Sequence, residues 1–152
     1  MDRGEMSEHL QLGDILAQRV AVMLRDKSHI IDVGGGDGRH SLFFAEKGYK
    51  VTFNDFSEPK YTHENIDTIL CNFMTTSINI PRFDAAFICH VLEHQLNVNS
   101  FLGKVAMAVK DGGIIAICVP PAKHQIVSGH VTLWNAGLVL YNLVLAGLDC
   151  SR

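Results

Sequence analysis

The sequence predicts an α/β fold in which helices cover both faces of a parallel sheet. Short runs of β-branched and apolar residues recur along the chain, and stretches with helical spacing lie between most of them, which is the order expected of βαβ units. The runs are almost continuously apolar, as in strands whose two faces are both buried. The chain has 152 residues, 47% of them apolar, which is enough for one domain with its own core.

Each predicted element follows from a local pattern. Strands are expected at residues 29–33, 50–54, 68–71, 85–89 and 113–119. Apolar residues from Leu12 to Leu24 recur at helical spacing and predict an N-terminal helix. Further helices are expected at 41–47, at 99–109 and at 134–148, where the apolar residues from Trp134 to Leu148 repeat on one face. We therefore divide the chain into an N-terminal helical segment, residues 1–28, and a core, residues 29–152.

Composition argues against several classes of protein. The net charge is −3 and no lysine or arginine run is visible, so a surface that follows nucleic-acid phosphates is not expected. The four cysteines form no CxxC pair, which fits a reducing cytoplasm better than a disulfide framework. The first residues do not form a signal peptide, and no apolar run reaches the ~20 residues that span a bilayer. We expect a cytoplasmic protein without a nucleic-acid or membrane partner.

The loop at residues 32–38, Asp-Val-Gly-Gly-Gly-Asp-Gly, carries the strongest functional signal. Glycines allow positive φ angles and let a ligand approach the main chain closely. The helix that follows directs free N–H groups and a partial positive charge at that ligand. In open α/β sheets the ligand crevice lies at the carboxyl ends of the strands, beside this turn. The pattern therefore predicts a nucleotide-type ligand.

The glycine spacing narrows the choice of ligand. A GxGxxG dinucleotide fingerprint would need its third glycine at Arg39, and the GK[ST] ending of a phosphate-binding loop is absent. The loop instead reads GxGxG, with Asp32 two residues before the first glycine. An acid at this place disfavours a pyrophosphate and favours a cation. S-adenosylmethionine carries two cationic groups, an ammonium and a sulfonium.

Residues 31–38 resemble the first motif of class I S-adenosylmethionine-dependent methyltransferases, in which a carboxylate and GxGxG end the first strand. Later strings follow in the order of that family, at residues 51–55, 72–73, 83–94 and 110–113. The resemblance spans residues 29–148. It implies a Rossmann-like three-layer α/β/α sandwich with a mainly parallel sheet of five strands in the order 3-2-1-4-5. It also implies S-adenosyl-L-methionine as the cofactor.

The resemblance further implies which residues bind the cofactor. Asp55 would accept hydrogen bonds from both ribose hydroxyls, and Phe56 would pack on the adenine. Asn72 stands where the family often has an acid, and its carbonyl oxygen can still accept a bond from the adenine amino group. The full predicted set is Asp32, Gly34, Gly35, Gly36, Gly38, Asp55, Phe56, Asn72, Phe73 and Cys89.

Histidines that follow the fourth and fifth strands are the candidate catalytic residues. They are His90, His94, His124 and His130, and they would lie on the side of the crevice where a methyl acceptor binds. We take His90 first and His130 second as a general base, because imidazoles exchange protons near neutral pH. Trp134 could line the acceptor pocket, although packing in the core is the better single role for it.

The string from His90 to His94 also spells HxxEH, an inverted zinc-protease motif. On a helix the two histidines would share a face, with Glu93 beside them. The string follows a short strand directly, however, and we find no downstream helix that supplies a further ligand. We therefore expect no metal.

The resemblance implies methyl transfer to a small-molecule acceptor, such as a sugar or a biosynthetic intermediate. The NPPY-like string of enzymes that methylate amino groups is absent after the fourth strand, where Cys89 and His90 stand. A non-catalytic S-adenosylmethionine-binding or interaction module is an alternative. A nicotinamide-dependent oxidoreductase is less favoured, because the glycine spacing and Asp32 argue against it.

The family sheet ends in an antiparallel hairpin, and the chain ends at Arg152, where the sixth strand would begin. The fifth strand would then form an exposed apolar edge, which favours aggregation. We expect either a fragment that lacks the C-terminal hairpin or a partner chain over this edge, including a second copy in a homo-oligomer.

Overall fold

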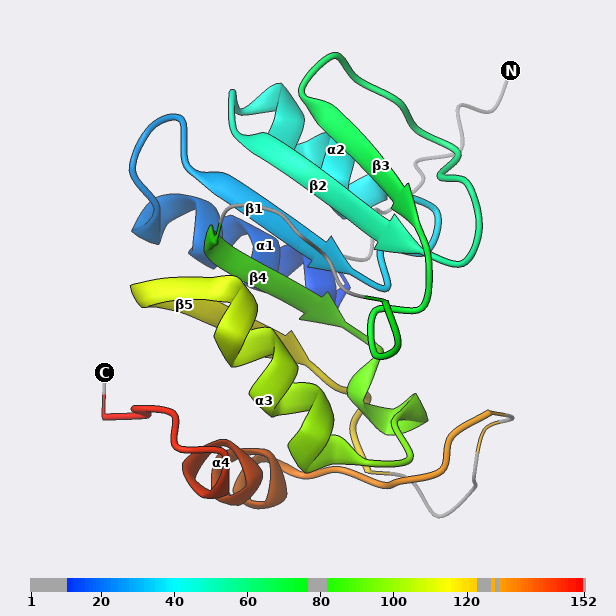
Figure 1. Cartoon of the computed structure of the whole chain (residues 1–152), viewed down its shortest axis with the longest axis vertical. Helices are drawn as coiled ribbons and strands as arrows, with labels where there is room; N and C mark the ends of the chain where they lie inside the picture. The colour runs from blue at the N-terminus through cyan, green and yellow to red at the C-terminus, as the bar shows by residue number, and fades with distance from the viewer. Residues whose placement is uncertain (1–10, 77–81, 123–126, 128, 152) are drawn as a thin grey trace, which may run out of the picture.

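Five strands form one sheet in the order β3-β2-β1-β4-β5, and every neighbouring pair is parallel (Figure 1). The computed structural model describes residues 11–76, 82–122, 127 and 129–151. The strands are β1 (His29–Val33), β2 (Lys50–Asp55), β3 (Ile66–Leu70), β4 (Phe83–Cys89) and β5 (Val109–Cys118). The predicted α/β class and strand order are therefore confirmed.

Helices cover both faces of this sheet, which gives three layers (Figure 1). One face carries α1 (Leu12–Met23) and α2 (Arg39–Glu46), and the other carries α3 (Val98–Ala108) and α4 (Ala136–Leu145). A short 3₁₀ helix, η1 (Leu92–His94), follows β4. None of the helices in the described ranges has the length and apolar character that crossing a membrane requires.

Strand β4 shows why the strand runs are continuously apolar. Successive side chains point to opposite faces of a sheet, so Ala85 and Phe87 join the core beneath α1 and α2, while Ala86 and Ile88 join the core beneath α3. All four residues are fully buried. The two cores lie back to back through the sheet, which fixes β4 and its neighbour β1 in the middle of the protein.

Strand β5 begins at Val109, four residues before the predicted start at 113, and its pairing with β4 shifts between Phe83 and Ala85. Glycine at 113 permits this irregularity, because a Cβ there would lie 2.8 Å from the carbonyl oxygen of Asp84. Among the described residues β5 pairs with β4 alone. Cover of its outer edge by a partner chain stays a prediction.

The last helix is shorter than the predicted 134–148. Helix α4 begins after Asn135, whose side-chain oxygen accepts a hydrogen bond from the Leu138 N–H at 2.9 Å. Trp134 lies before the helix and is buried in the core beneath α3. The spacing predicted that this helix buries one apolar face. That prediction is wrong, because Leu138, Tyr141 and Leu145 are all exposed.

We predict that Phe87→Ala lowers the free energy of unfolding by about 3–5 kcal/mol, the usual cost of deleting a buried ring. Phe87 is 0% exposed and packs edge to face on Phe44, with ring centroids 5.3 Å apart. Urea denaturation followed by circular dichroism measures the change. Met107→Ala is the control, because Met107 is 70% exposed, and it is expected to change stability by less than ~1 kcal/mol. Equal effects of the two substitutions would contradict this account of the core.

Candidate functional site

The glycine loop joins the carboxyl ends of β1 and β2. The N–H groups of Gly34 and Gly35 both donate to the Asn54 carbonyl oxygen, at 2.8 and 3.1 Å. The Gly36 N–H donates to Asp55 Oδ2 at 2.9 Å. Asp55 is the last residue of β2, so this bond holds the loop and the second predicted acid at one edge of the sheet.

Two of the glycines are required for different reasons. Gly34 has a φ of +68°, and a Cβ there would lie 2.5 Å from a methyl group of Val91. Gly36 has a φ of +60°, but a Cβ there would meet nothing within 4 Å. Glycine adopts such angles without strain, whereas most other residues do not. Gly34 therefore allows close packing of the loop on the segment after β4, while the space above Gly36 is left free for a ligand.

A cavity of about 160 Å³ opens beside this loop. Six of the predicted residues line it: Asp32, Gly34, Gly35, Gly36, Cys89 and His90. The other residues of its lining are Gln11, Gly13, Asp37, Arg39 and His40. Two larger cavities, of about 270 and 470 Å³, are lined by other residues, with Lys50 and Asp67 in one and Gln18 and Tyr49 in the other. They bring together no comparable set of glycines and acids.

Asp32 is a buried acid in the wall of this cavity. It is 1% exposed, and its Oδ2 accepts a 2.7 Å hydrogen bond from the Ser41 hydroxyl. Burial raises the pKa of Asp32 to about 6, with a smaller upward contribution from Asp55, while the bond from Ser41 opposes the increase. A buried carboxylate is unfavourable without a cation nearby, so this wall of the cavity favours a positively charged ligand group.

Helix α1 closes one side of the crevice, which the sequence did not predict. A Cβ on Gly13 would lie 2.7 Å from Cys89 Sγ and 2.9 Å from the His40 ring, so this turn of the helix packs directly on the ends of β4 and α2. Asp14 holds the contact, since its Oδ1 lies 3.0 Å from Arg39 Nη2 and 3.2 Å from His40 Nε2. Asp37 lies within the glycine loop and Arg39 directly follows it, and these positions were the available sequence signal for the two residues.

Cys89 ends β4 beside Cys118, which is its partner in β5. Burial raises the pKa of the Cys89 thiol to about 12, and the neighbouring Cys118 adds to the increase. The thiol therefore stays protonated at neutral pH. Cys89 is a small wall residue of the crevice and not a nucleophile, because the thiolate is the nucleophilic form.

The remaining predicted cofactor residues lie outside the cavity lining. Asp55 adjoins it through Gly36, and Phe56 is 75% exposed next to Asp55. The Asn72 side-chain oxygen accepts a 2.8 Å hydrogen bond from the Met74 N–H. Phe73 is buried in the core, with its ring centroid 5.8 Å from that of Phe101, so its placement is that of a packing residue. Gly38 has a φ of +84° and caps the start of α2.

His90 holds an unusual backbone conformation at the mouth of the crevice. Its φ is +59°, a region that residues other than glycine rarely adopt and that is often found at functional sites. The His90 N–H donates to the Cys118 carbonyl oxygen at 2.9 Å. Its ring Nδ1 lies 3.3 Å from Glu93 Oε1. Since η1 begins only at Leu92, His90 and His94 do not share a helical face. At these residues the structure therefore lacks the helical arrangement that a zinc-protease motif requires.

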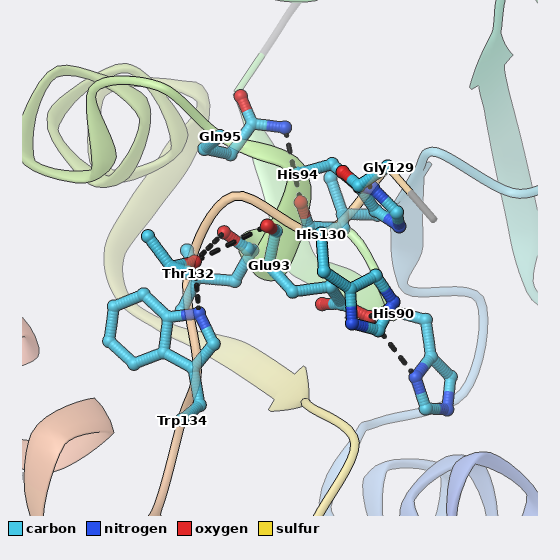
Figure 2. Close-up of polar contacts among 10 residues, drawn as sticks. His90, Glu93, His94, Gln95, Gly129, His130, Thr132 and Trp134 are labelled. Atoms are coloured by element: carbon cyan, nitrogen blue, oxygen red, sulfur yellow. Dashed lines mark hydrogen bonds and ion pairs between the residues drawn. The ribbon is translucent and has the colours of Figure 1, made fainter. Parts of the chain in front are cut away.

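Glu93 is the polar centre around which the histidines gather (Figure 2). It is 1% exposed, and its Oε1 lies 4.0 Å from His130 Nε2 as well as 3.3 Å from His90. The rings of His94 and His130 meet edge to face, with centroids 4.9 Å apart. The structure thus brings the two candidate catalytic residues to one carboxylate. His124, the other histidine of the predicted group, lies outside the described residues.

Backbone hydrogen bonds hold His130 in this place. The Glu93 carbonyl oxygen accepts the N–H groups of Val131 and Thr132, at 2.9 and 3.2 Å. The Thr132 hydroxyl in turn accepts a 2.7 Å bond from the Trp134 indole N–H. Trp134 is therefore a core anchor for the segment that carries His130 (Figure 2), and it does not line the cofactor cavity. The HxxEH string was the only sequence signal for Glu93.

The sequence matches the family model described as "Methyltransferase domain" over residues 6–143. The tRNA 5-carboxymethoxyuridine methyltransferase of Escherichia coli K12 is 24% identical over 157 aligned positions, which cover 90% of this chain and 58% of that protein. The (S)-coclaurine N-methyltransferase of Papaver somniferum is 28% identical over 116 positions, which cover 68% and 32% of the two chains. The chain thus spans at most 58% of the length of these relatives.

Among solved structures, the 1,6-didemethyltoxoflavin-N1-methyltransferase of Burkholderia thailandensis, with bound 1,6-didemethyltoxoflavin and S-adenosylhomocysteine, superposes with a TM-score of 0.74. It is 19% identical, and the match covers 91% of this chain and 68% of that one. At this identity the likeness shows the fold. The family model covers residues 6–143 of a 152-residue chain. The chain therefore belongs to the methyltransferase domain family, whose cofactor is S-adenosylmethionine.

Proposed function

We propose that the chain binds S-adenosylmethionine in the crevice at the carboxyl ends of β1 and β4 and transfers its methyl group to a small-molecule acceptor. One observation carries the proposal: a buried acid, a glycine loop with free space above it and His90 all line one cavity. Asp32 can attract the cationic end of the cofactor, and His90 lies where it can accept a proton from the methyl acceptor.

In this proposal three features hold the cofactor. Asp32 attracts the ammonium group, because opposite charges interact strongly at short range when one of them is buried. Gly36 leaves room for the cofactor against the main chain. Asp55 Oδ2 accepts the Gly36 N–H at 2.9 Å, and Oδ1 accepts the N–H groups of Phe56 and Ser57 at 2.6 and 3.4 Å. Oδ2 therefore keeps a lone pair for a ribose hydroxyl. The cavity of 160 Å³ takes part of the cofactor, and the rest lies along the open rim beside Asp55.

The cofactor supplies an electrophilic methyl group on its sulfonium. The protein has to hold the acceptor in line with that group, and such positioning contributes a large part of the rate. His90 accepts the proton that the acceptor loses, since it lines the cavity and Glu93 fixes its ring orientation through Nδ1. His130 lies at the same carboxylate but does not line the cavity.

A small molecule is the favoured acceptor. The chain has a net charge of −3 and no basic run, whereas binding of a polynucleotide normally requires a positive surface. One relative is named (S)-coclaurine N-methyltransferase and another tRNA 5-carboxymethoxyuridine methyltransferase, so tRNA belongs in the test as a competing acceptor.

Two measurements test the proposal. Calorimetric titration with S-adenosylhomocysteine should show binding of one molecule per chain, with no binding of NAD. Transfer of a labelled methyl group to a panel of alcohols, phenols, amines and bulk tRNA should label a small molecule. Binding without transfer to any acceptor would favour a non-catalytic cofactor-binding module, and labelled tRNA would overturn the small-molecule acceptor.

The Asp32→Asn substitution is expected to weaken S-adenosylhomocysteine binding by about 10- to 100-fold, the usual value of a hydrogen bond to a charged partner. The asparagine oxygen can still accept the Ser41 bond, so the fold is expected to remain. Titration calorimetry at pH 7.5 measures the change, and Asp67→Asn is the matched control, because Asp67 is exposed on β3. Unchanged affinity in Asp32→Asn would rule out this acid as the cation partner.

The same substitution should change the dependence of stability on pH. The pKa of Asp32 is raised from 3.8 to about 6 in the folded protein, so the folded state binds its proton more tightly than the unfolded state does. The stability of the ligand-free protein must then fall as the pH rises through this range, by about 2 kcal/mol between pH 4 and pH 7. Urea denaturation at several pH values should show this loss in the wild type relative to Asp32→Asn. Parallel curves for the two proteins would contradict the assignment.

The His90→Asn substitution tests the acceptor side. Asparagine tolerates positive φ angles, so this substitution removes the imidazole while preserving the strained backbone. We expect kcat to fall by about 10²- to 10⁴-fold, while the affinity for S-adenosylhomocysteine stays within about threefold of the wild-type value. His63→Asn is the control, because His63 lies in the loop before β3. A wild-type rate in His90→Asn would remove His90 from the catalytic site.

A further inference from the structure

Glu93 carries a polar atom that the rest of the site does not satisfy. Its Oε1 has His90 and His130 as neighbours, but its Oε2 is fully buried and has no hydrogen-bond partner in the described part of the chain. Buried carboxyl oxygens are normally hydrogen-bonded, and an exception indicates an unrecorded ion, a ligand or a functional role. Methyl transfer as proposed above makes no use of this atom.

Two imidazoles accompany this carboxylate. One nitrogen of His94, one nitrogen of His130 and one oxygen of Glu93 all lie within 4.8 Å of one another. His94 Nδ1 lies 2.7 Å from the Gly129 carbonyl oxygen. A carbonyl can only accept, so Nδ1 carries the proton and Nε2 keeps the lone pair that a metal requires. Histidines that bind metals are commonly oriented by such a bond to a main-chain carbonyl.

We propose that Glu93, His94 and His130 bind a divalent transition-metal ion of the zinc class. Two histidines and a glutamate form the protein ligand set of some catalytic zinc sites, in which a fourth position stays open. Magnesium and calcium are excluded by the same set, because they prefer oxygen ligands. Metal–ligand bonds of about 2.0–2.1 Å place tetrahedral ligands roughly 3.3 Å apart, so the exposed ring of His94 has to close by a small rotation.

This proposal replaces the expectation of no metal. That expectation rested on the position of the HxxEH string directly after a strand and on the absence of a downstream helix that supplies a further ligand. The structure supplies one from a segment after β5, because the backbone bonds of Val131 and Thr132 to Glu93 bring His130 beside η1. His90 is not needed as a ligand. It lies between the metal site and the cofactor cavity, in contact with Glu93 and in the cavity lining.

The position of the ion indicates the class of acceptor, in an argument that rests on the proposed methyl transfer. A metal beside His90 would hold an acceptor through an oxygen in its open coordination position. Metal binding makes a bound hydroxyl a stronger acid, so the hydroxyl proton passes more readily to His90. We infer that the acceptor is an alcohol or phenol that binds the metal through its oxygen.

A second group of possible ligands, Cys89, His90 and Cys118, lies near the same place. Its two cysteines are paired neighbours in β4 and β5, and it contains no buried nitrogen or oxygen atom without a hydrogen-bond partner among the residues described. The glutamate–histidine cluster is therefore the better site, and a cysteine substitution distinguishes the two.

Titration of untagged, EDTA-treated protein with ZnCl₂, MnCl₂ and MgCl₂ tests the site. Calorimetry should show one zinc ion per chain and no magnesium. Glu93→Gln, His94→Ala and His130→Ala should each weaken zinc binding at least tenfold, while Cys118→Ala and His63→Ala keep it. Zinc at about 100 times its dissociation constant should raise the wild-type Tm by ~5–10 °C, with little rise in the three ligand variants.

Binding of S-adenosylhomocysteine is measured on every variant and shows whether it has folded. Absence of zinc binding in the wild type would overturn the proposal, as would full binding in the ligand variants. Loss of binding in Cys118→Ala, with His94→Ala unaffected, would move the ion to the cysteine cluster and equally overturn it. Zinc binding in a protein that binds no S-adenosylhomocysteine would leave the metal site standing and would instead reject the proposed function.

Discussion

The parallel pairing of β1 between β2 and β4 is the constraint on which the crevice depends. Parallel strands end at the same edge of a sheet, so β1 delivers the glycine loop between the ends of its two neighbours. The Asn54 carbonyl from β2 fixes the loop through two N–H groups. From β4 come Cys89 and His90, which form the opposite wall. A shift of one residue in either pairing would turn buried faces outward and separate the acid, the loop and the histidine.

The two ends of the site contain buried carboxyl groups with different surroundings. Asp32 has Ser41 as a hydrogen-bond partner and lies against the cofactor cavity. Glu93 has imidazoles on one oxygen and no partner on the other, among the residues described. Both arrangements are unfavourable in the protein alone, because buried charge needs a partner. In our interpretation each acid is stabilised by a cation that arrives from outside, the ammonium of the cofactor at Asp32 and a metal ion at Glu93.

Local patterns were sufficient to predict most of the strands and the loop. Mainly apolar runs mark the strands except β3, in which Asp67 and Thr68 are exposed, and the GxGxG spacing with its preceding acid lies in one continuous string. Asp32 and the glycines therefore needed no long-range information, whereas the strand order followed from the family resemblance. Contacts between distant segments could not be predicted in this way. The packing of Gly13 on Cys89 and the place of His130 beside Glu93 arise from tertiary structure. Phe73 lies after β3, where the family resemblance implies a cofactor contact, and its ring packs in the core, so its role in cofactor binding stays a prediction.

The most direct test of the central claim is the location of cofactor binding, which backbone amide chemical shifts measured during titration with S-adenosylhomocysteine would reveal. We predict the largest changes at Gly34, Gly35 and Gly36, with further changes at Asp55 and His90. Lys50 and Asp67 lie near the amino ends of β2 and β3, away from the crevice, and should remain unaffected. Changes centred on Lys50 and Asp67, or no changes at saturating ligand, would contradict the assignment of the crevice.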